Sequence, residues 1–272
     1  MSLPPVAIYG MGRFGRALAG ALRRAGPGPL RTGGRRQGPA ALLRGLRPGT
    51  LVMLSVLDDA IPLVAAEFAA LPQCRRHSFV HASGAHGPAL LRPLSRAGAS
   101  VGAFHILQTF PPLHGGRRVA GSWCAIAGPP PLLRRLRALA RRLEMRPFVL
   151  ADRQRPAYHA AAVLASNALV ALLDAGRTLL QGRGIGKRAA VMLLPLVLGT
   201  LENVATLGAE TALTGPVVRG DAGTLRAHAA VLPATLKPLY RELMTQTIAL
   251  ALRSGRITPA QARQLKQALP RA

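Results

Sequence analysis

The first fifteen residues place the strongest constraint on how this chain can fold. A short apolar run, Pro5–Tyr9, is typical of a buried strand, and it leads into the turn Gly10–Gly15, whose sequence is GMGRFG. A helical pattern follows, because Phe14, Leu18 and Leu22 recur at intervals of four residues. A strand, a glycine-rich turn and a helix in this order predict the start of an α/β fold.

Strand and helix patterns keep alternating as far as residue 150, which predicts a doubly wound parallel sheet with helices on both faces. A weak second strand near Pro29-Leu30 is followed by a basic loop, Arg31–Arg36. The remaining expected strands are Thr50–Val56, Ser78–Ala82, Ser100–Phe104, Ser122–Ala127 and Met145–Leu150. Between them we expect helices at Leu42–Leu46, from Asp58 or Asp59 as the N-cap to about Ala70, and at Leu132–Leu143.

The pattern becomes purely helical after residue 150. The switch near Ala151–Arg155 predicts two domains, residues 1–150 and an all-α domain of residues 151–272. The expected helices of the second domain are Pro156–Leu180, Lys187–Gly208, Thr224–Leu232, Leu236–Arg253 and Pro259–Leu269.

The charge balance is strongly basic, with 36 Lys and Arg residues against 10 Asp and Glu residues and a net charge of +26. Such a balance suggests a polyanionic partner. The arginines are scattered along the chain, however, and aromatic residues make up only 4% of it, so stacking surfaces for single-stranded nucleic acid are scarce. We therefore expect the protein not to act through nucleic acid.

Cysteine usage and apolar runs exclude other classes. Two cysteines cannot build a disulfide scaffold. The longest apolar run, Ala189–Leu201, contains Pro195 and Gly199 and falls below the roughly 20 residues of a membrane helix. No secretory leader is visible, so we expect a soluble, cytoplasmic protein without a membrane partner. No metal site is expected, because metal-ligand spacing is absent among His81, His86, His105, His114, Cys74 and Cys124.

The glycine turn has the spacing of a dinucleotide-binding loop. In such loops the first glycine allows a tight turn, the second admits a pyrophosphate, and the third lets the helix pack on the strand. The helix N-terminus offers free backbone N–H groups to phosphates. The alternative is an ordinary turn in a glycine-rich chain. The expected contacts are Gly10, Gly12, Arg13, Phe14 and Gly15.

An acidic residue is missing where an NAD site needs one. NAD-preferring loops place Asp or Glu about 20 residues beyond the glycines, to bind the ribose hydroxyls. Here no carboxylate precedes Asp58, and the corresponding segment is basic. Arginine binds a phosphate through two parallel hydrogen bonds, so the sequence favours NADP, with its 2′-phosphate, over NAD. The expected contacts are Arg31, Thr32, Arg35 and Arg36, unless these residues form only a solvated basic loop.

The chain also resembles a known family in four segments: FVHASG at 79–84, GAFHILQTF at 102–110, YHAAA at 158–162 with Ser166-Asn167, and ALTGPVVRGD at 212–221. These segments are similar to those of an uncharacterised bacterial family that pairs a Rossmann-like domain with a C-terminal helical domain of unknown function. That family is related to ketopantoate reductases, pyrroline-5-carboxylate reductases, imine reductases and β-hydroxyacid dehydrogenases. The resemblance implies a Rossmann-type fold, an NADP-dependent reductase with its active site between the domains, and a homodimer built on the helical domain. The chain departs from the family pattern at Ile106, where a proline is common.

The first expected all-helical segment carries the candidate catalytic residues. Steps of seven and eight residues return to nearly the same helix face, so His159, Ser166 and Asn167 are expected to share a stripe of an otherwise apolar helix. A histidine can donate a proton near neutral pH, so we predict His159 as the proton donor with Asn167 beside it. Ketopantoate reductases, as the resemblance implies, carry Lys at the position of His159 and Asn at i+4 and i+8. Here i+4 is Val163, so the lysine mechanism does not carry over, and a purely structural His–Asn pair is the alternative.

Further contacts are expected where strands end and between helices. Val56, Leu57 and Ser83 follow strands at the edge where ligands bind open α/β sheets, and they are predicted to contact the nicotinamide. Ser83 has a turn role as its alternative. The predicted substrate contacts are His105, Asn203, Thr214, Arg219 and Asp221, and Asp221 is equally suited to cap the helix that starts at Ala222.

These features predict an NADP-dependent oxidoreductase that reduces a small carbonyl or imine substrate. The alternatives are a ketopantoate-type reductase of coenzyme A precursor synthesis, and a non-catalytic dinucleotide- or polyanion-binding protein.

Overall fold

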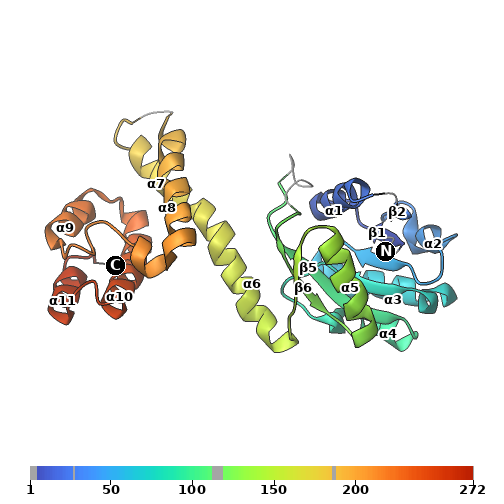
Figure 1. Cartoon of the computed structure of the whole chain (residues 1–272). Helices are drawn as coiled ribbons and strands as arrows, with labels where there is room; N and C mark the ends of the chain where they lie inside the picture. Colours follow the sequence, from blue (N-terminus) through green and yellow to red (C-terminus); the bar gives the residue numbers. More distant parts are fainter. Residues whose placement is uncertain (1–4, 27, 112–118, 186–187, 272) are drawn as a thin grey trace. The chain divides into compact units, whose positions relative to one another are not determined.

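A computed structural model of the chain describes residues 5–26, 28–111, 119–185 and 188–271. The chain forms two compact units, Met1–Ser166 and Asn167–Ala272 (Figure 1). The division falls within the long helical segment that begins at Arg155.

The first unit is built on a sheet whose described strands number seven, in the order β2-β1-β3-β4-β5-β6-β7. Strands β1 to β5 are parallel, and helices pack on both faces, which confirms the predicted Rossmann-type α/β fold (Figure 1). The strands are β1 Val6–Tyr9, β2 Leu30–Gly33, β3 Leu51–Leu54, β4 Ser78–His81, β5 Ser100–Leu107, β6 Trp123–Ala127 and β7 Arg146–Val149.

The register of the parallel strands places the last residues of β1, β2, β3 and β4 side by side in the sheet. Tyr9 pairs with both Gly33 and Leu54, and Leu54 pairs with His81. The loops that follow β1, β2, β3 and β4 therefore leave the sheet side by side. This carboxyl edge is where ligands bind in open α/β sheets.

Two apolar cores hold the helices on the sheet. The strands are buried on both faces, as expected for parallel strands between helical layers. Side chains of α1 and α5, such as Leu18 and Leu136, form one core with Ile8 and Met53. Side chains of α2, α3 and α4 form the other. The helices are α1 Arg13–Arg24, α2 Gly38–Leu43, α3 Ile61–Ala69, α4 Arg92–Arg96 and α5 Pro130–Arg142.

The sheet differs from the prediction at both ends. Strands β6 and β7 are parallel to each other, but β6 runs antiparallel to β5, so the sheet is mixed. A short continuous apolar run looks the same in either direction, so the sequence pattern did not reveal the reversal. At the other end, β2 extends to Gly33, so Arg31 and Thr32 lie within a strand and not in the expected loop.

The expected N-cap of the third helix is also wrong. Asp58 and Asp59 belong to a 3-10 turn, Asp58–Ala60, that precedes α3. No side chain among the described residues caps α3, whose N-cap is Ala60. Asp58 accepts a hydrogen bond from Ser83 Oγ, so its carboxylate is directed to the next strand end.

The predicted helix Pro156–Leu180 is divided by a π-helical turn, Leu164–Ala168, into α6 Arg155–Val163 and α7 Leu169–Gln181. Because that turn widens the helix locally, the uniform seven- and eight-residue spacing used for His159, Ser166 and Asn167 does not hold across it.

The second unit is helical, as predicted. Its small core joins α9, α10 and α11 through residues such as Leu225, Ile248 and Leu265. Helix α8 breaks at Gly208, which has φ +78, close to the predicted end of that helix; its predicted first residue, Lys187, lies outside the described residues. After α7, the helices are α8 Ala189–Ala212, α9 Ala222–Val231, α10 Lys237–Arg253 and α11 Pro259–Gln267.

The apolar run Ala189–Leu201, predicted to be too short for a membrane helix, is part of the longer helix α8, which continues through Pro195 and Gly199 to Ala212. By length and composition alone, two segments are apolar and long enough to cross a membrane, Asp152–Gln181 and Val191–Ala212. The apolar windows in both are exposed in this chain. The expectations of a cytoplasmic protein and of no membrane partner therefore stay predictions.

Candidate functional site

The glycine turn follows β1 at the carboxyl edge. Gly10 has φ +105, and a Cβ on it would overlap the carbonyl oxygen of Ser55. A Cβ on Gly15 would overlap the carbonyl oxygen of Gly10, so helix and turn pack backbone to backbone. Both glycines are thus required by the fold itself, as expected for a tight turn with close helix packing.

Gly12 differs from its two neighbours in the motif. It is the exposed N-cap of α1, and a Cβ on it would meet nothing within 4 Å among the described residues. No described side chain caps α1. The start of α1 therefore has no side chain at Gly12 and no side-chain cap, as the second glycine of a dinucleotide-binding loop requires.

Two candidate contacts flank this turn. Phe14 is half-buried, and its ring packs edge-to-face on Phe110 with centroids 5.3 Å apart. Val56, after β3, lies beside Gly10. Arg13 is exposed, and Leu57 is 83% exposed, which is unusual for a leucine at a strand end. An exposed apolar side chain at this edge suits contact with a flat ring.

The basic residues near β2 divide into two groups. The guanidinium of Arg31 donates to the carbonyl oxygens of Arg44 and Ala41, at the end of α2, so it has a structural role in this structure. Thr32 is half-buried within the strand. Arg35 and Arg36 are exposed in the turn that follows β2. The sequence predicts that they stand where an NAD site would have a carboxylate.

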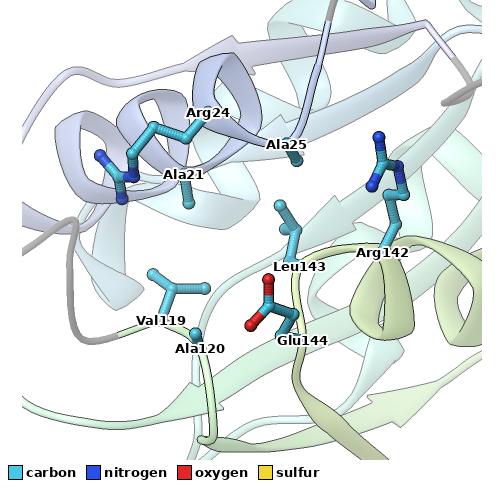
Figure 2. Close-up of a pocket in the computed structure, with 8 residues that line it drawn as sticks. All are labelled: Ala21, Arg24, Ala25, Val119, Ala120, Arg142, Leu143 and Glu144. Atoms are coloured by element: carbon cyan, nitrogen blue, oxygen red, sulfur yellow. The ribbon is translucent and has the colours of Figure 1, made fainter.

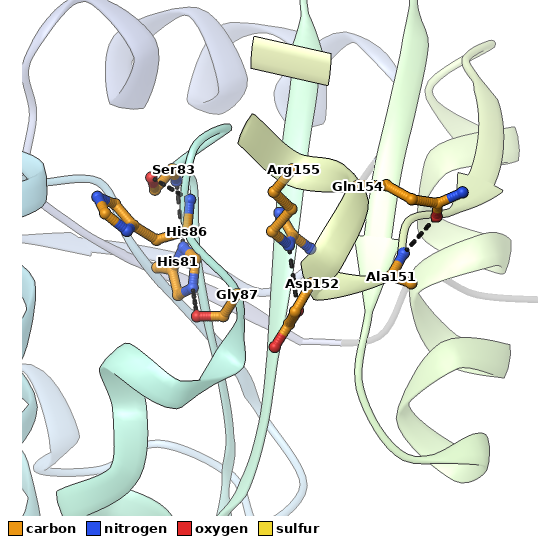
Figure 3. A network of polar contacts seen from close by, with 8 residues as sticks. All are labelled: His81, Ser83, His86, Gly87, Ala151, Asp152, Gln154 and Arg155. Atoms are coloured by element: carbon orange, nitrogen blue, oxygen red, sulfur yellow. Dashed lines mark hydrogen bonds and ion pairs between the residues drawn. The ribbon is translucent and has the colours of Figure 1, made fainter. Parts of the chain in front are cut away.

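A hydrogen-bonded network joins the ends of β3 and β4. Ser83 Oγ donates to Asp58 Oδ2 over 2.6 Å and accepts from the backbone N–H of His86. The backbone N–H of Ser83 donates to His81 Nδ1, so His81 carries its proton on Nε2 and donates it to the carbonyl oxygen of Gly87 (Figure 3). The predicted contact Ser83 is thus buried and held in a fixed orientation.

A second pair joins β5 to α6. His105 Nδ1 and the Tyr158 hydroxyl lie 2.8 Å apart, and their rings meet edge-to-face. His105 Nε2 lies against Gly84, where an added Cβ would come within 2.7 Å of it. His159 lies close enough for its charge to act on His105. The structure thus brings His105 and His159, both predicted site residues, into one cluster with Tyr158.

Burial moves the titration of this pair away from neutral pH in opposite directions. It lowers the pKa of His105 to about 4, assisted by the charges of His159 and Arg155. It raises the pKa of Tyr158 to about 12. At pH 7 the imidazole is therefore neutral and the phenol is protonated, so Tyr158 donates and His105 Nδ1 accepts.

Two histidines of this site should make the stability of the fold depend on pH. Burial also lowers the pKa of His81 to about 4, against 6.5 for an ordinary histidine. Between these values the unfolded chain binds more protons than the folded one. We expect the free energy of unfolding to be constant above pH 6.5, to fall as the pH drops toward 4, and to level off there. The loss is on the order of 3 kcal/mol per histidine, measured by urea unfolding at each pH.

A matched pair of variants tests this origin. His105→Gln should flatten part of the pH dependence, whereas His86→Gln, at an exposed position where its charge is the smallest contribution to the pKa of His81, should change it far less. A urea midpoint that stays the same from pH 7 to pH 4.5 in the wild type would contradict the assignment.

The second unit holds the remaining predicted substrate contacts. Asn203 and Thr214 both line a cavity of about 580 Å³ between α8 and Leu250. Arg219 is exposed. Asp221 caps α9, because its two carboxylate oxygens accept from the backbone N–H and the hydroxyl of Thr224. These hydrogen bonds lower the pKa of the Asp221 carboxyl. Its alternative role as a helix cap is thus observed.

Another cavity, of about 120 Å³, lies at the ends of α1 and α5 (Figure 2). Arg24, Arg142 and Glu144 line it, and Glu144 has the left-handed backbone angle φ +57. None of the predicted site residues lines this cavity. In the described part of the chain, no group of three His, Cys, Asp or Glu side chains is placed to hold a metal ion. His114 lies outside that part.

Sequence reasoning missed Tyr158 and Arg155 as members of this site. Arg155, Tyr158 and His159 stand at i, i+3 and i+4 of one helix, so they share a face. That spacing was the available signal. The predicted polar stripe ran from His159 toward the C-terminus, to Ser166 and Asn167, and so left out the residues that precede His159.

Comparison with known proteins agrees with this picture. Residues 122–247 match a family described as a domain of unknown function, DUF2520. No curated protein gives a significant match.

Solved structures share the fold over nearly the whole chain. A candidate NADP oxidoreductase from Bacteroides fragilis has a TM-score of 0.66 at 20% identity, covering 97% of this chain and 98% of its own. Pyrroline carboxylate reductase from Plasmodium falciparum, with NADP bound, has a TM-score of 0.59 at 11% identity, covering 98% and 99%. An imine reductase from Myxococcus stipitatus in complex with NADP⁺ has a TM-score of 0.58 at 16% identity, covering 97% and 93%.

These similarities establish the fold. They agree with the resemblance to Rossmann-like reductases that carry a C-terminal helical domain. The narrower family relationships, the substrate and the site residues stay predictions.

Proposed function

We propose that this chain is an NADP-dependent oxidoreductase that reduces a small carbonyl or imine compound. The observation that carries the proposal is the open helix N-terminus at Gly12, beside a turn in which Arg35 and Arg36 replace the carboxylate of an NAD site. The fold requires glycine at positions 10 and 15 but not at position 12, where a side chain would have room. A ligand that approaches the backbone there would explain the second glycine. The NADP-bound neighbours support the same cofactor class.

The residues of the carboxyl edge fit a division of roles. The backbone N–H groups after Gly12 would hold the pyrophosphate, and Arg35 and Arg36 the 2′-phosphate. Val56, Leu57 and Ser83 would border the nicotinamide. NADPH would supply the hydride.

The protein must then supply a proton to the carbonyl oxygen or imine nitrogen. A general acid works best when its pKa lies near the operating pH. The pKa values of His105 and Tyr158 lie far below and far above pH 7. His159, which lies beside His105, is the proposed proton donor, and the Tyr158–His105 pair holds the site beside it. The candidate contacts of the second unit, Asn203, Thr214 and Arg219, stay predictions for substrate binding.

A screen of NADPH oxidation against 2-oxo acids, keto-lactones and cyclic imines tests the activity. Ketopantoate in that screen tests the narrower alternative of a ketopantoate-type reductase. A non-catalytic dinucleotide-binding protein would bind NADPH with no substrate-dependent oxidation.

The cofactor site has its own test in Gly12→Ala. Because an added methyl group meets nothing and φ is −68, the variant should fold as the wild type does. It should bind NADPH at least 10-fold more weakly, since the methyl group keeps the pyrophosphate from the backbone. The measurement is fluorescence titration of NADPH, with thermal unfolding as the control for folding. Unchanged NADPH affinity in a folded variant would show that the turn holds no dinucleotide.

We also propose that the second unit forms a homodimer through α7 and α8. Large apolar side chains remain exposed there, among them Val170, Val191, Leu196 and Leu198, each at least 65% exposed. Apolar surface of this extent on two helices that contact each other indicates an interface. Light scattering at micromolar concentration should give the mass of a dimer.

Substitution tests where the dimer forms. Leu196→Glu with Leu198→Glu should shift the mass to that of a monomer, whereas Leu63→Glu, at a residue 65% exposed on α3, should not. A wild-type monomer, or recovery of the protein in the membrane fraction, would overturn the proposal.

A further inference from the structure

Arg155, the first residue of α6, is a buried cation with most of its hydrogen-bonding capacity unused. It is 1% exposed, although residues 151–154, 156 and 157 on either side are exposed. Its Nε donates to Asp152 Oδ1 over 3.3 Å. Both of its Nη atoms are buried and have no hydrogen-bond partner among the described residues.

This arrangement is costly for the protein alone. Burying a charge without pairing it is strongly unfavourable. The one ion pair is long, and the Asp152 side chain is 60% exposed, so it compensates little. A methionine or leucine would fill the same space without the cost. A chain that keeps an arginine here is expected to use it.

The position of Arg155 indicates the use. Val149, the last residue of β7, pairs with Ile126, which pairs with Phe104 next to the level at which β4 ends. The segment after β7 therefore begins at the carboxyl edge. Asp152 lies against Gly87, whose carbonyl oxygen accepts from His81 (Figure 3).

The charge of Arg155 also reaches the proposed proton-transfer cluster. It contributes to the lowered pKa of His105 and of His81, and it acts on Tyr158. Residues at i, i+3 and i+4 of a helix stand about 5–6 Å apart. Arg155 thus lies about one helical turn from Tyr158 and His159.

We propose that Arg155 binds a carboxylate of the substrate, so that the substrate class is a 2-oxo or 2-imino acid. This inference rests on the proposed function. The two Nη atoms present a planar edge that matches a carboxylate through two parallel hydrogen bonds. Arg155 and His159 lie about one helical turn apart. A substrate whose carboxylate binds Arg155 and whose carbonyl or imine group meets His159 therefore has these two groups on neighbouring carbon atoms. Because the Nη atoms are covered, binding is accompanied by a local shift of segment 151–157, in which every residue except Arg155 is exposed.

The test compares acids with their neutral amides. Calorimetry on the full-length protein with NADP⁺, which prevents turnover, measures binding of pyruvate against pyruvamide and of phenylpyruvate against phenylpyruvamide. The wild type should prefer the acid at least 10-fold in one of these pairs. Arg155→Met should abolish the preference, and Arg155→Lys should restore part of it. Arg153→Met, at an exposed neighbouring arginine, should behave as the wild type.

Thermal unfolding without ligand gives a second readout, which a purely structural role would move in the opposite direction. Arg155→Met should raise Tm by roughly 2 to 8 °C, because it removes an uncompensated buried charge. A lower Tm with unchanged acid preference would overturn the proposal, as would a wild type that prefers no acid over its amide.

A separate titration of NADPH distinguishes failure of the proposed function. If NADPH does not bind, the cofactor assignment fails, while the Tm of Arg155→Met and the acid–amide comparison without nucleotide still report on Arg155.

Discussion

Replacing His159 by phenylalanine is expected to lower kcat by roughly 10²- to 10⁴-fold, the usual contribution of a general acid. The side chain is half-buried beside His105, and phenylalanine keeps its ring volume while removing the proton. The affinity for NADPH should barely change, because the proposed contacts to the pyrophosphate and the 2′-phosphate are in the loops after β1 and β2. Steady-state kinetics on the substrate found by the NADPH screen, with NADPH titration alongside, measures both quantities.

Two further variants separate chemistry from positioning. Tyr158→Phe removes the hydroxyl that holds His105, so we expect a smaller loss of kcat. Asn167→Ala should also cause a smaller loss, divided between KM and kcat. A folded His159→Phe variant with full activity would show that His159 is structural and that the proton comes from another group.

Reversing the charge of the turn after β2 should have an effect of similar size on the cofactor. In the double variant Arg35→Glu with Arg36→Glu, two charge-assisted contacts to the 2′-phosphate become repulsive. Each such contact contributes about 1.5–3 kcal/mol, so the Kd for NADPH should rise by roughly 10²- to 10⁴-fold. The Kd for NADH should stay the same or fall, because NADH has no 2′-phosphate.

The strongly basic chain requires a control for its overall field. Arg47→Glu with Arg96→Glu changes the net charge equally at two exposed positions outside the turn, and should leave the preference for NADPH intact. Equal Kd values for NADPH and NADH in the wild type would remove the basis of the prediction. Arg31 is a poorer target than the sequence suggested, because a carboxylate there would face the carbonyl oxygens at the end of α2.

Most of the parallel sheet could be predicted because burial on two faces leaves continuous apolar runs, as at Leu51–Leu54 and Ser78–His81. The glycine turn could be predicted for a different reason. Gly10 and Gly15 are fixed by steric contacts with the backbone, and such contacts exclude every other residue. Strand direction was not predictable, since the apolar run of β6 carries no information about the direction of its partner.

The site was predictable only where one strand end or one helix determined it. His105 and His159 were found separately, but their proximity depends on pairing across the sheet, which spacing in the sequence does not encode. The role of Tyr158 could not be predicted, because its hydrogen-bond partner His105 is 53 residues away in the sequence. Arg155 was missed because the sequence predicts an arginine in a polar segment to be solvent-exposed, and only the structure shows that it is buried.

The reversed strand has a consequence for how the site tolerates mutation. Strand β5 is held by β4 only through Ser100–Ala103, and beyond that by β6, where His105 pairs with Ala125. A slip of one residue between β5 and β6 would turn His105 to the opposite face of the sheet. The position of the His105 imidazole relative to Tyr158 therefore depends on β6, a strand with no side chain among the proposed site residues. Substitutions of the buried residues of β6 should therefore lower activity, although these residues are remote from the proposed chemistry.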